Sequence, residues 1–234
     1  TRYSYTTTNG VKLLTGISTC RTTGSCTGGA DETKVTIGYD ARMQPTTVTR
    51  AAGDNSLSAT TTTGYDGFGN VTSIDGPLSG SGDVARFEYD ADRRLTGSMT
   101  ADPDGAGARK IPASKFTYNS DGQVTLAQRG TVPSGATDWS GFTASEAVQS
   151  SYDGNARKIK NVVSAGGTDH AVTQYGYTNR GLLVCVAQRM DPAQWAGQSD
   201  SCTPQTTGPN GPDRVQQRGF DAMGRVVDYH NSLD

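Results

Sequence analysis

One acid–histidine pair in the sequence has the residue types of a nucleophilic catalyst. Asp169 and His170 are neighbours, and Ser164 lies shortly before them. A Ser-His-Asp triad is defined by spatial geometry, so residue types alone do not exclude one. However, the sequence has no Gly-x-Ser-x-Gly motif, and His170 follows Gly166-Gly167-Thr168, which is typical of a hairpin connection. We therefore predict that the chain is not an enzyme and has no catalytic residue.

The four cysteines could form disulfides, bind a metal ion or remain free thiols. Four cysteines allow three pairings, and closeness in the chain favours Cys20 with Cys26 and Cys185 with Cys202. A disulfide that closes a loop this short contributes about 2 to 3 kcal/mol to the free energy of unfolding. The Cys-x5-Cys spacing is not usual for zinc, and only 2 histidines are available as nitrogen ligands. We predict two local disulfides, no metal and no cofactor, which indicates the periplasm, the cell surface or the outside of the cell.

The acidic segment Asp102-Pro103-Asp104-Gly105 invites comparison with a calcium loop. Such a loop needs more oxygen ligands in a longer register that ends in an acidic residue, and none follows at that place. The sequence therefore predicts an exposed acidic turn.

Composition favours strands over helices and excludes several classes of partner. Hydrophobic residues make up 33% of the 234 residues, with 30 glycines and many threonines. This favours a thin wall of strands and turns over a thick core. The 21 basic and 23 acidic residues are spread along the chain, so we predict no nucleic-acid partner. No apolar run of membrane-spanning length occurs, so we predict no membrane insertion.

A pattern, Tyr-Asp-x-x-Gly-x-(apolar)-Thr, recurs along the whole chain and is clearest at 65–72. Its period is about 24 to 29 residues, with longer intervals where loops are inserted, and such a period is typical of a stacked array. We predict one continuous array over residues 1–234 with loops near 17–32, 131–148 and 188–215. The anchors are Tyr5, Tyr39, Tyr65, Tyr89, Tyr118, Tyr152, Tyr177 and Phe220, of which Tyr5 is a degenerate copy.

Each copy is interpreted as a β-hairpin. The aromatic ends one strand, and the carboxylate after it accepts hydrogen bonds from the following N–H groups. A glycine four residues after the anchor then takes the positive φ that closes the turn. Met43, Arg93 and Ala156 replace the glycine and would be strained there unless their turns differ. The predicted turn residues are Asp40, Asp66, Asp90, Asp153 and Asp221 with Gly69, Gly122, Gly181 and Gly224.

Strand alternation before the anchors predicts one buried face. Ile37, Phe87 and Phe116 lie two residues before an anchor and are expected to be buried beneath it. In the 131–148 insertion we expect one helical turn from Thr143 or Ser145. We expect Trp139 to pack its own loop against the sheet rather than to bind a sugar or a partner. In the last insertion, Asp191 and Pro192 favour a short helical turn, and Trp195 is expected to pack it on the wall.

These anchors and spacings resemble the YD repeats of the RHS family, which includes bacterial Rhs proteins, shell components of insecticidal toxin complexes and teneurins. The resemblance covers nearly the whole chain. The segments 185–192 and 211–215 around Cys202 are also similar to an insertion of proteobacterial Rhs proteins. The resemblance implies an all-β fold of tandem hairpins in a long twisted antiparallel sheet, which winds into a spiral and closes into a hollow shell in full-length members. The turns would then be structural.

The expected function follows from this resemblance. The chain would be a structural shell segment of a secreted or cell-surface Rhs-type protein that encapsulates a C-terminal effector, commonly a toxin. Because both ends run into repeat-like sequence, we expect an internal piece whose partners are the RHS core and effector of its own longer polypeptide. The alternative is a surface adhesin or filament-forming protein that binds glycans, cells or copies of itself, since exposed edge strands can pair.

Overall fold

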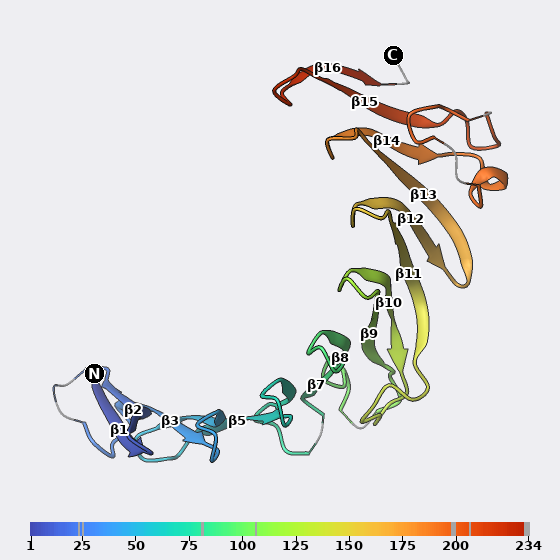
Figure 1. The fold of residues 1–234 in the computed structure, drawn as a ribbon. Helices are drawn as coiled ribbons and strands as arrows, with labels where there is room; N and C mark the ends of the chain where they lie inside the picture. The colour runs from blue at the N-terminus through green and yellow to red at the C-terminus, as the bar shows by residue number, and fades with distance from the viewer. Residues whose placement is uncertain are drawn as a thin grey trace. The chain divides into compact units, whose positions relative to one another are not determined.

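The computed structural model describes residues 1–22, 24, 26–80, 82–105, 107–197, 200–205 and 207–231. They form an all-β structure in which sixteen antiparallel strands follow one another in chain order in one open sheet (Figure 1). The only helical element of these residues is the short 3-10 turn η1, Pro192–Gln194. In this described part of the chain, no helix has the length and hydrophobicity to span a membrane.

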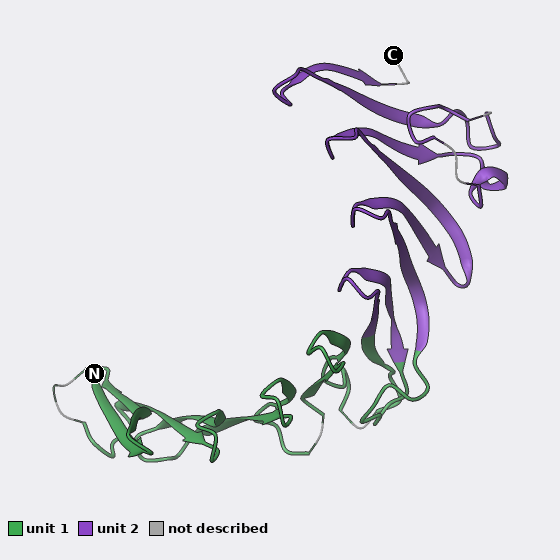
Figure 2. Ribbon diagram, viewed as in Figure 1, with its two compact units in different colours: residues 1–113, 132–142 green, residues 114–131, 143–234 purple. Residues whose placement is uncertain are grey.

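The chain forms two compact units (Figure 2), residues 1–113 with 132–142 and residues 114–131 with 143–234. The strands of unit 1 are β1 Arg2–Thr8, β2 Val11–Cys20, β3 Glu32–Tyr39, β4 Pro45–Ala52, β5 Ser58–Tyr65, β6 Val71–Asp75, β7 Val84–Tyr89 and β8 Leu95–Met99. The strands β9 Ile111–Tyr118 and β10 Val124–Val132 contribute residues to both units. The strands of unit 2 are β11 Thr143–Tyr152, β12 Lys158–Ala165, β13 Thr168–Tyr177, β14 Leu183–Arg189, β15 Arg214–Phe220 and β16 Val226–Asn231.

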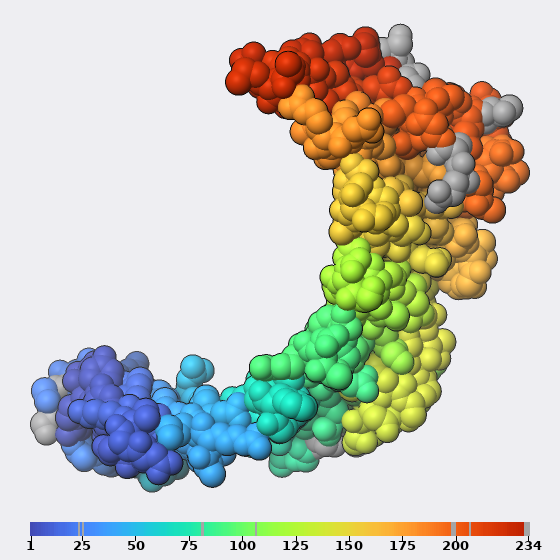
Figure 3. All heavy atoms as spheres, in the orientation of Figure 1, coloured from blue at the N-terminus to red at the C-terminus, as the bar shows by residue number. Residues whose placement is uncertain are grey.

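Every second strand from β3 to β15 ends on an anchor aromatic. The anchor pairs with the residue six positions later, as Tyr65 does with Val71 and Tyr177 with Leu183. The register shifts by one residue just before the anchor, which is the mark of a β-bulge. Within unit 2 the hairpin turns lie along one side, and the described part of residues 190–213 lies at the opposite end of the strands (Figures 1 and 3).

Strand alternation gives each unit two different faces. Directly opposed residues of antiparallel strands project to the same face. We call the face that carries the anchors the tyrosine face, and the face that carries the residue before each anchor, such as Gly64 and Gly176, the glycine face. Ile37, Phe87 and Phe116 share the tyrosine face with their anchors but are only half-buried. The prediction that they are buried is therefore wrong, because none of the described residues forms a second layer over them.

Buried residues gather where an inserted loop folds onto the glycine face. In unit 1, Met99, Ile111, Ala113 and Val132 form a core cluster against which Trp139 and Phe142 pack. In unit 2, the buried residues include Val172, Gln174, Cys185, Ala187, Arg189, Asp213 and Val215. Packing density in this chain thus depends on the insertions rather than on the repeats.

Two local predictions are wrong. Thr143 and Ser145 do not begin a helical turn, because both belong to strand β11, whose pairing with β10 begins at Thr143. Tyr5 does not end a strand but lies within β1. The chain instead reverses at Asn9 and Gly10, with φ of 50° and 78°, and two left-handed residues are what a tight two-residue hairpin turn requires.

The three insertions are shorter than the sequence suggested, because the flanking strands extend into them. The connections span residues 21–31, 133–142 and 190–213. The helical turn in the last one is present: Asp191 caps η1 by accepting a hydrogen bond from the N–H of Ala193, and proline occupies the first turn.

Candidate functional site

Seven turns share one backbone arrangement. In the copy after Tyr65, the N–H of Asp66 donates to the carbonyl of Asn70 at 3.0 Å, and the N–H of Gly69 donates to the carbonyl of Asp66 at 3.2 Å. The same two hydrogen bonds occur after Tyr39, Tyr89, Tyr118, Tyr152, Tyr177 and Phe220. The repeat is therefore a structural unit and not only a sequence pattern.

The carboxylate that follows the anchor organises the turn. Oδ1 of Asp66 accepts hydrogen bonds from the N–H groups of Phe68 at 2.8 Å and Asn70 at 2.9 Å. The equivalent pair of bonds is made by Asp40, Asp90, Asp153 and Asp221. Asn119 holds this place in its repeat and accepts through its amide oxygen at 3.1 and 2.9 Å. The turn thus requires an acceptor oxygen and tolerates loss of the charge.

The position five residues after the anchor was missed by the sequence reasoning. In four turns its side chain donates to the second carboxylate oxygen, as when Nε of Arg157 donates to Oδ2 of Asp153 at 2.7 Å. A sequence signal was present, since six of the seven turns carry a polar side chain there: Gln44, Asn70, Arg94, Gln123, Arg157 and Arg225. The exception is Leu182, whose N–H donates to the hydroxyl of Thr178 at 3.1 Å.

The residue four after the anchor is left-handed in every turn, whatever its type. Gly69 and Gly181 have φ of 87° and 81°. Met43, Arg93 and Ala156 have φ of 64°, 62° and 62°, a region that side chains with a Cβ rarely adopt. The turns without glycine therefore do not differ in geometry, and they bear the strain.

Four anchor hydroxyls connect their hairpin to the one before it. The hydroxyl of Tyr65 donates to the carbonyl of Pro45 at 3.0 Å, and that of Tyr177 donates to the carbonyl of Lys158 at 2.9 Å. Tyr152 makes the equivalent bond, and Tyr39 donates to a carbonyl of β2. Phe220 occupies the anchor position without a hydroxyl and cannot make this bond.

Neighbouring turns also contact one another directly. In unit 1, Nη1 of Arg42 donates to the carbonyl of Gly67 at 2.7 Å. In unit 2, Nη1 of Arg157 donates to the carbonyl of Thr178 at 3.1 Å and its guanidinium lies 4.8 Å from the ring centre of Tyr177. These bonds fix the spacing between successive hairpins within each unit.

Hydrogen bonds lower the pKa of four turn carboxylates, those of Asp66, Asp90, Asp153 and Asp221. Donation from the side chain and the N–H of Arg157 lowers the pKa of Asp153 below its ordinary value. Partial burial acts to raise the pKa of Asp66, but hydrogen bonds from Asn70 and the turn amides outweigh it and lower that pKa. The ionised form of these carboxylates is thus the one the turn binds best.

Both disulfides are present in the pairing that the sequence favoured, with Cα atoms 5.7 Å apart for Cys20–Cys26 and 5.2 Å apart for Cys185–Cys202. The first closes the 21–31 insertion. Beside it Glu32, which is 3% exposed, accepts hydrogen bonds from the hydroxyl of Ser18 and from the N–H of Gly28.

The 190–213 insertion buries an ion pair against the glycine face. Nη1 of Arg189 donates to Oδ2 of Asp213 at 2.8 Å, and both side chains are 1% exposed. Asp213 also accepts from the N–H groups of Met190 and Gln205, at 2.7 and 2.9 Å. Burial acts to raise the pKa of Asp213, but these donors outweigh it and the pKa is lowered. The sequence reasoning did not assign this pair.

The 133–142 insertion is held by an aromatic side chain. A Cβ atom on Gly97 would lie 2.6 Å from Cε2 of Trp139, so the indole occupies the space that the glycine leaves open. Trp195 is fixed differently, since its indole N–H donates to the carbonyl of Arg189 at 2.9 Å.

The residues considered for catalysis are not assembled into a site. Ser164 lies opposite Asp169 in the β12–β13 register, while the exposed His170 falls at the irregularity beside this pair. Asp102 forms a local turn by accepting a hydrogen bond from the N–H of Asp104 at 3.3 Å. Among the described residues, no three acidic, histidine or cysteine side chains lie together as a potential metal site.

Residues 65–106 match the RHS Repeat family model. Over this range the chain resembles an RHS repeat. The matched range contains the Tyr65 and Tyr89 turns, whose hydrogen bonds are those of the other five. No curated protein matches the sequence.

Several solved structures resemble parts of this fold. The crystal structure of TcdB2-TccC3 is 11% identical with a TM-score of 0.41, and the match covers 87% of this chain and 12% of that one. The Photorhabdus luminescens Tc holotoxin pore is 12% identical with a TM-score of 0.35, covering 86% and 12%. A porin-like protein from Bacteroides uniformis is 10% identical with a TM-score of 0.34, covering 86% and 91%. The chain thus spans 12% of the length of the first two structures.

Proposed function

We propose that this chain is a wall segment of an RHS-type shell that encloses a separate C-terminal effector of its own longer polypeptide. Its repeats build the wall and carry no reaction of their own. The observation that carries the proposal is the RHS-repeat turn, whose aspartate, anchor hydroxyl and neighbouring guanidinium are all engaged in holding backbone. In these turns the three groups bind the backbone of the chain itself, which is a structural role.

The unequal use of the two sheet faces supports a wall. The three insertions and both disulfides lie against the glycine face. Trp139, for example, lies on Gly97. Cys202 lies on Gly176, where a Cβ atom added to the glycine would be 3.4 Å from its Sγ. The tyrosine face has no such cover and includes Ile74 and Val163, which are 39% and 41% exposed. A sheet with one braced face and one open face is suited to separating an inside from an outside.

The two disulfides support an oxidising location. We place the protein in a secreted or cell-surface setting, where it would hold its effector, commonly a toxin in the resembling family, until delivery.

The test is the mass and protection of the native polypeptide that carries this segment. The protein is purified from its source with its disulfides intact, and intact mass and peptide mapping are measured with and without denaturant. The proposal expects a much longer chain and a separately cut C-terminal piece that stays bound and resists protease until denaturant is added.

A native chain of about this size, with no bound piece, would instead favour an adhesin or filament. Its first and last strands expose Tyr3, Tyr5 and Tyr229 at 59%, 52% and 51%. Concentration-dependent assembly in light scattering, lost when charged residues replace these tyrosines, would support that second reading.

A further inference from the structure

Two strands of the sheet have an open edge. Strands β1 and β16 stand at the two ends of the strand order, so among the described residues each pairs on one side only. The other side presents backbone N–H and C=O groups that can pair with a further strand. Neither Arg2–Thr8 nor Val226–Asn231 contains the proline or lysine that commonly blocks such an edge. Both edges are therefore competent to pair.

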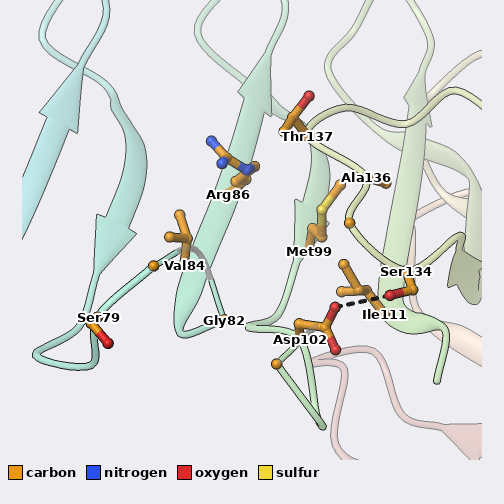
Figure 4. A pocket seen from close by; sticks show the side chains of 13 residues that line it. Ser79, Gly82, Val84, Arg86, Met99, Asp102, Ile111, Ser134, Ala136 and Thr137 are labelled. Atoms are coloured by element: carbon orange, nitrogen blue, oxygen red, sulfur yellow. Dashed lines mark hydrogen bonds between the residues drawn. The ribbon is translucent and has the colours of Figure 1, made fainter. Parts of the chain in front are cut away.

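Five junctions between successive hairpins share one register. The residue eight after one anchor opposes the residue three before the next, as Ser73 opposes Arg86 between β6 and β7. Arg86 lines a cavity of about 440 Å³ in unit 1, where Figure 4 shows it on its strand. The same offset holds for the pairs Thr47–Thr62, Leu126–Gln149, Lys160–Gln174 and Cys185–Gln217. A strand that joins the sheet at either edge is expected to adopt this offset.

Strand β1 carries the structural equivalent of an anchor at Tyr5. Its register with β2 shifts just before Tyr5, as it does before other anchors, and Tyr5 pairs with Leu14. The hydroxyl of Tyr39 donates to the carbonyl of Leu14 at 2.8 Å. The hydroxyl of Tyr65 donates in the same way to the carbonyl of Pro45, which is the partner of Tyr39. Although β1 continues beyond Tyr5, it can thus join a preceding hairpin as the other anchor strands do.

The shared register brings opposite charges together. Asp228 lies eight residues after the anchor Phe220, and Arg2 lies three residues before Tyr5. When β1 of a second copy joins β16 at this offset, Arg2 therefore opposes Asp228. Opposite charges that face each other across two strands stabilise the pairing.

Both charged side chains are available for this contact, since Arg2 is 56% and Asp228 53% exposed. Oδ2 of Asp228 lies 2.8 Å from Nε2 of His230, and Oδ1 faces no such donor among the described residues. The side-chain hydrogen bonds of Arg2 within the described chain all leave from Nη2, so Nε and Nη1 remain for a carboxylate. Their acceptors are Ser18, Thr27 and Glu32.

The two faces of the sheet match as well. Asp228 opposes Gly219 and so projects to the glycine face. Arg2 projects to the same face, where it contacts Glu32 beside the disulfide-closed insertion. The next pair at this offset is Val227 with Tyr3, which falls on the tyrosine face. These two side chains are 65% and 59% exposed, and pairing would cover both.

We propose that β16 of one copy of this chain pairs with β1 of a second copy, antiparallel, with Asp228 opposite Arg2. The hydroxyl of Tyr5 then reaches the carbonyl of Val226, which lies six residues after the anchor Phe220. Because the two edges differ, the contact is head to tail and can repeat from copy to copy. The filament considered above would form through this contact.

The contact does not depend on an enclosed effector. The mass of the native polypeptide tests the shell, whereas self-association of the 234-residue chain tests this contact, so either proposal can fail alone.

The first measurement is sedimentation velocity with light scattering on the whole chain, with both disulfides oxidised, at concentrations up to about 1 mM. We expect the average mass to keep rising with concentration rather than to stop at two copies. Amide hydrogen exchange should slow at 2–4 and 226–229 as the mass rises, because these strands become paired on both sides.

Two charge variants test the register. Arg2→Glu and Asp228→Lys each place like charges opposite one another, so each alone should weaken association by about fivefold or more. An equal mixture of the two should recover it, because each variant then meets the opposite charge on the other. Arg50→Glu is the control and should leave association unchanged, since Arg50 lies on β4, which is paired on both sides.

A second pair of variants has the same design on the tyrosine face and leaves the contact between Arg2 and Glu32 intact. Tyr3→Glu and Val227→Lys should each weaken association, and their mixture should recover it. A mass that stays at one chain would overturn the proposal and leave the edges to another partner. Association that neither pair weakens would overturn it as non-specific aggregation, and mixtures that do not recover association would overturn the register.

Discussion

Unit 2 is stabilised in two contrasting ways at the two ends of its strands. At one end the 190–213 insertion covers the glycine face over Val172, Ala187, Arg189 and Val215, and we call this the covered patch. At the other end lie the four hairpin turns that follow Tyr118, Tyr152, Tyr177 and Phe220, which we call the turn row. The covered patch holds most of the buried side chains of the unit, while the turn row consists mainly of hydrogen bonds near the surface.

This difference indicates which residues contribute most to the free energy of unfolding of a single-layer sheet. In a repeat array each repeat contacts only its neighbours, so the turns of the turn row make many small and similar contributions to the free energy of unfolding. In the covered patch polar and apolar side chains are buried together. Loss of one polar side chain there leaves its buried hydrogen-bond partners unsatisfied. Substitutions should therefore have large effects in the patch and small ones in the row.

The largest effect is expected at the buried ion pair. Arg189→Met should lower the free energy of unfolding by about 3 to 5 kcal/mol, because it leaves the Asp213 carboxylate buried without its cation. Urea unfolding with both disulfides oxidised measures the change. Arg225→Met is the matched control in the turn row, since Arg225 is 76% exposed beside Asp221, and it should have little effect. Similar losses in the two variants would remove the distinction between patch and row.

The two tryptophans sharpen the comparison between insertions. Trp195→Phe should cost about 1 to 2 kcal/mol, because the carbonyl of Arg189 loses the indole donor. Trp139→Phe should cost less than about 1 kcal/mol, because its indole nitrogen is buried with no hydrogen-bond partner. Thermal unfolding of both variants measures the difference. A reversed order would mean that ring packing, rather than the N–H, decides how each insertion is held.

The two regions also differ in how far the sequence predicts them. The turn row was largely predictable, because its signal is local: an aromatic, an acid and a glycine at fixed spacing specify one turn and its strands. The side chain five after the anchor, as in Arg157, was overlooked although its polarity recurs. The disulfides followed from closeness in the chain.

The covered patch was not predictable in the same way. Arg189 and Asp213 are 24 residues apart, and nothing local distinguishes them from exposed charges. Their pairing depends on how the 190–213 insertion folds back, which is a tertiary outcome. Phe87 and Phe116 are likewise only half-buried because none of the described residues forms a second layer over their face. Strand alternation alone does not predict whether such a layer is present.

A smaller change in the free energy of unfolding, of opposite sign, is expected at Ala156, one of the turn residues with positive φ. Ala156→Gly should stabilise the chain by about 0.5 to 1 kcal/mol, because φ of 62° is unfavourable for alanine. Gly181→Ala is the reverse control, since a Cβ there meets nothing within 4 Å and only the φ of 81° opposes it. It should destabilise by a similar amount. Unfolding in urea measures both, and a loss of stability in Ala156→Gly would show that the methyl group contributes contacts.

The last and smallest effect concerns acid. The folded pKa of Asp153 is lowered by its hydrogen bonds from Arg157, so its ionised form favours the folded state. Its contribution is complete above the unfolded pKa of about 4 and is lost as the pH falls through the lower folded pKa. Asn119 makes the same two Oδ1 hydrogen bonds without a titrating group.

Asp153→Asn should therefore change stability little at pH 7 and flatten its decline between about pH 4 and pH 2, because a neutral acceptor replaces one that is protonated in this range. Asn119→Asp should do the opposite and steepen the decline. Unfolding free energies measured across this range in both variants decide the matter. If Asp153→Asn leaves the slope unchanged, then acid sensitivity comes from carboxylates outside the turn row, with the buried Asp213 of the covered patch the first to examine, and the row is held by geometry alone.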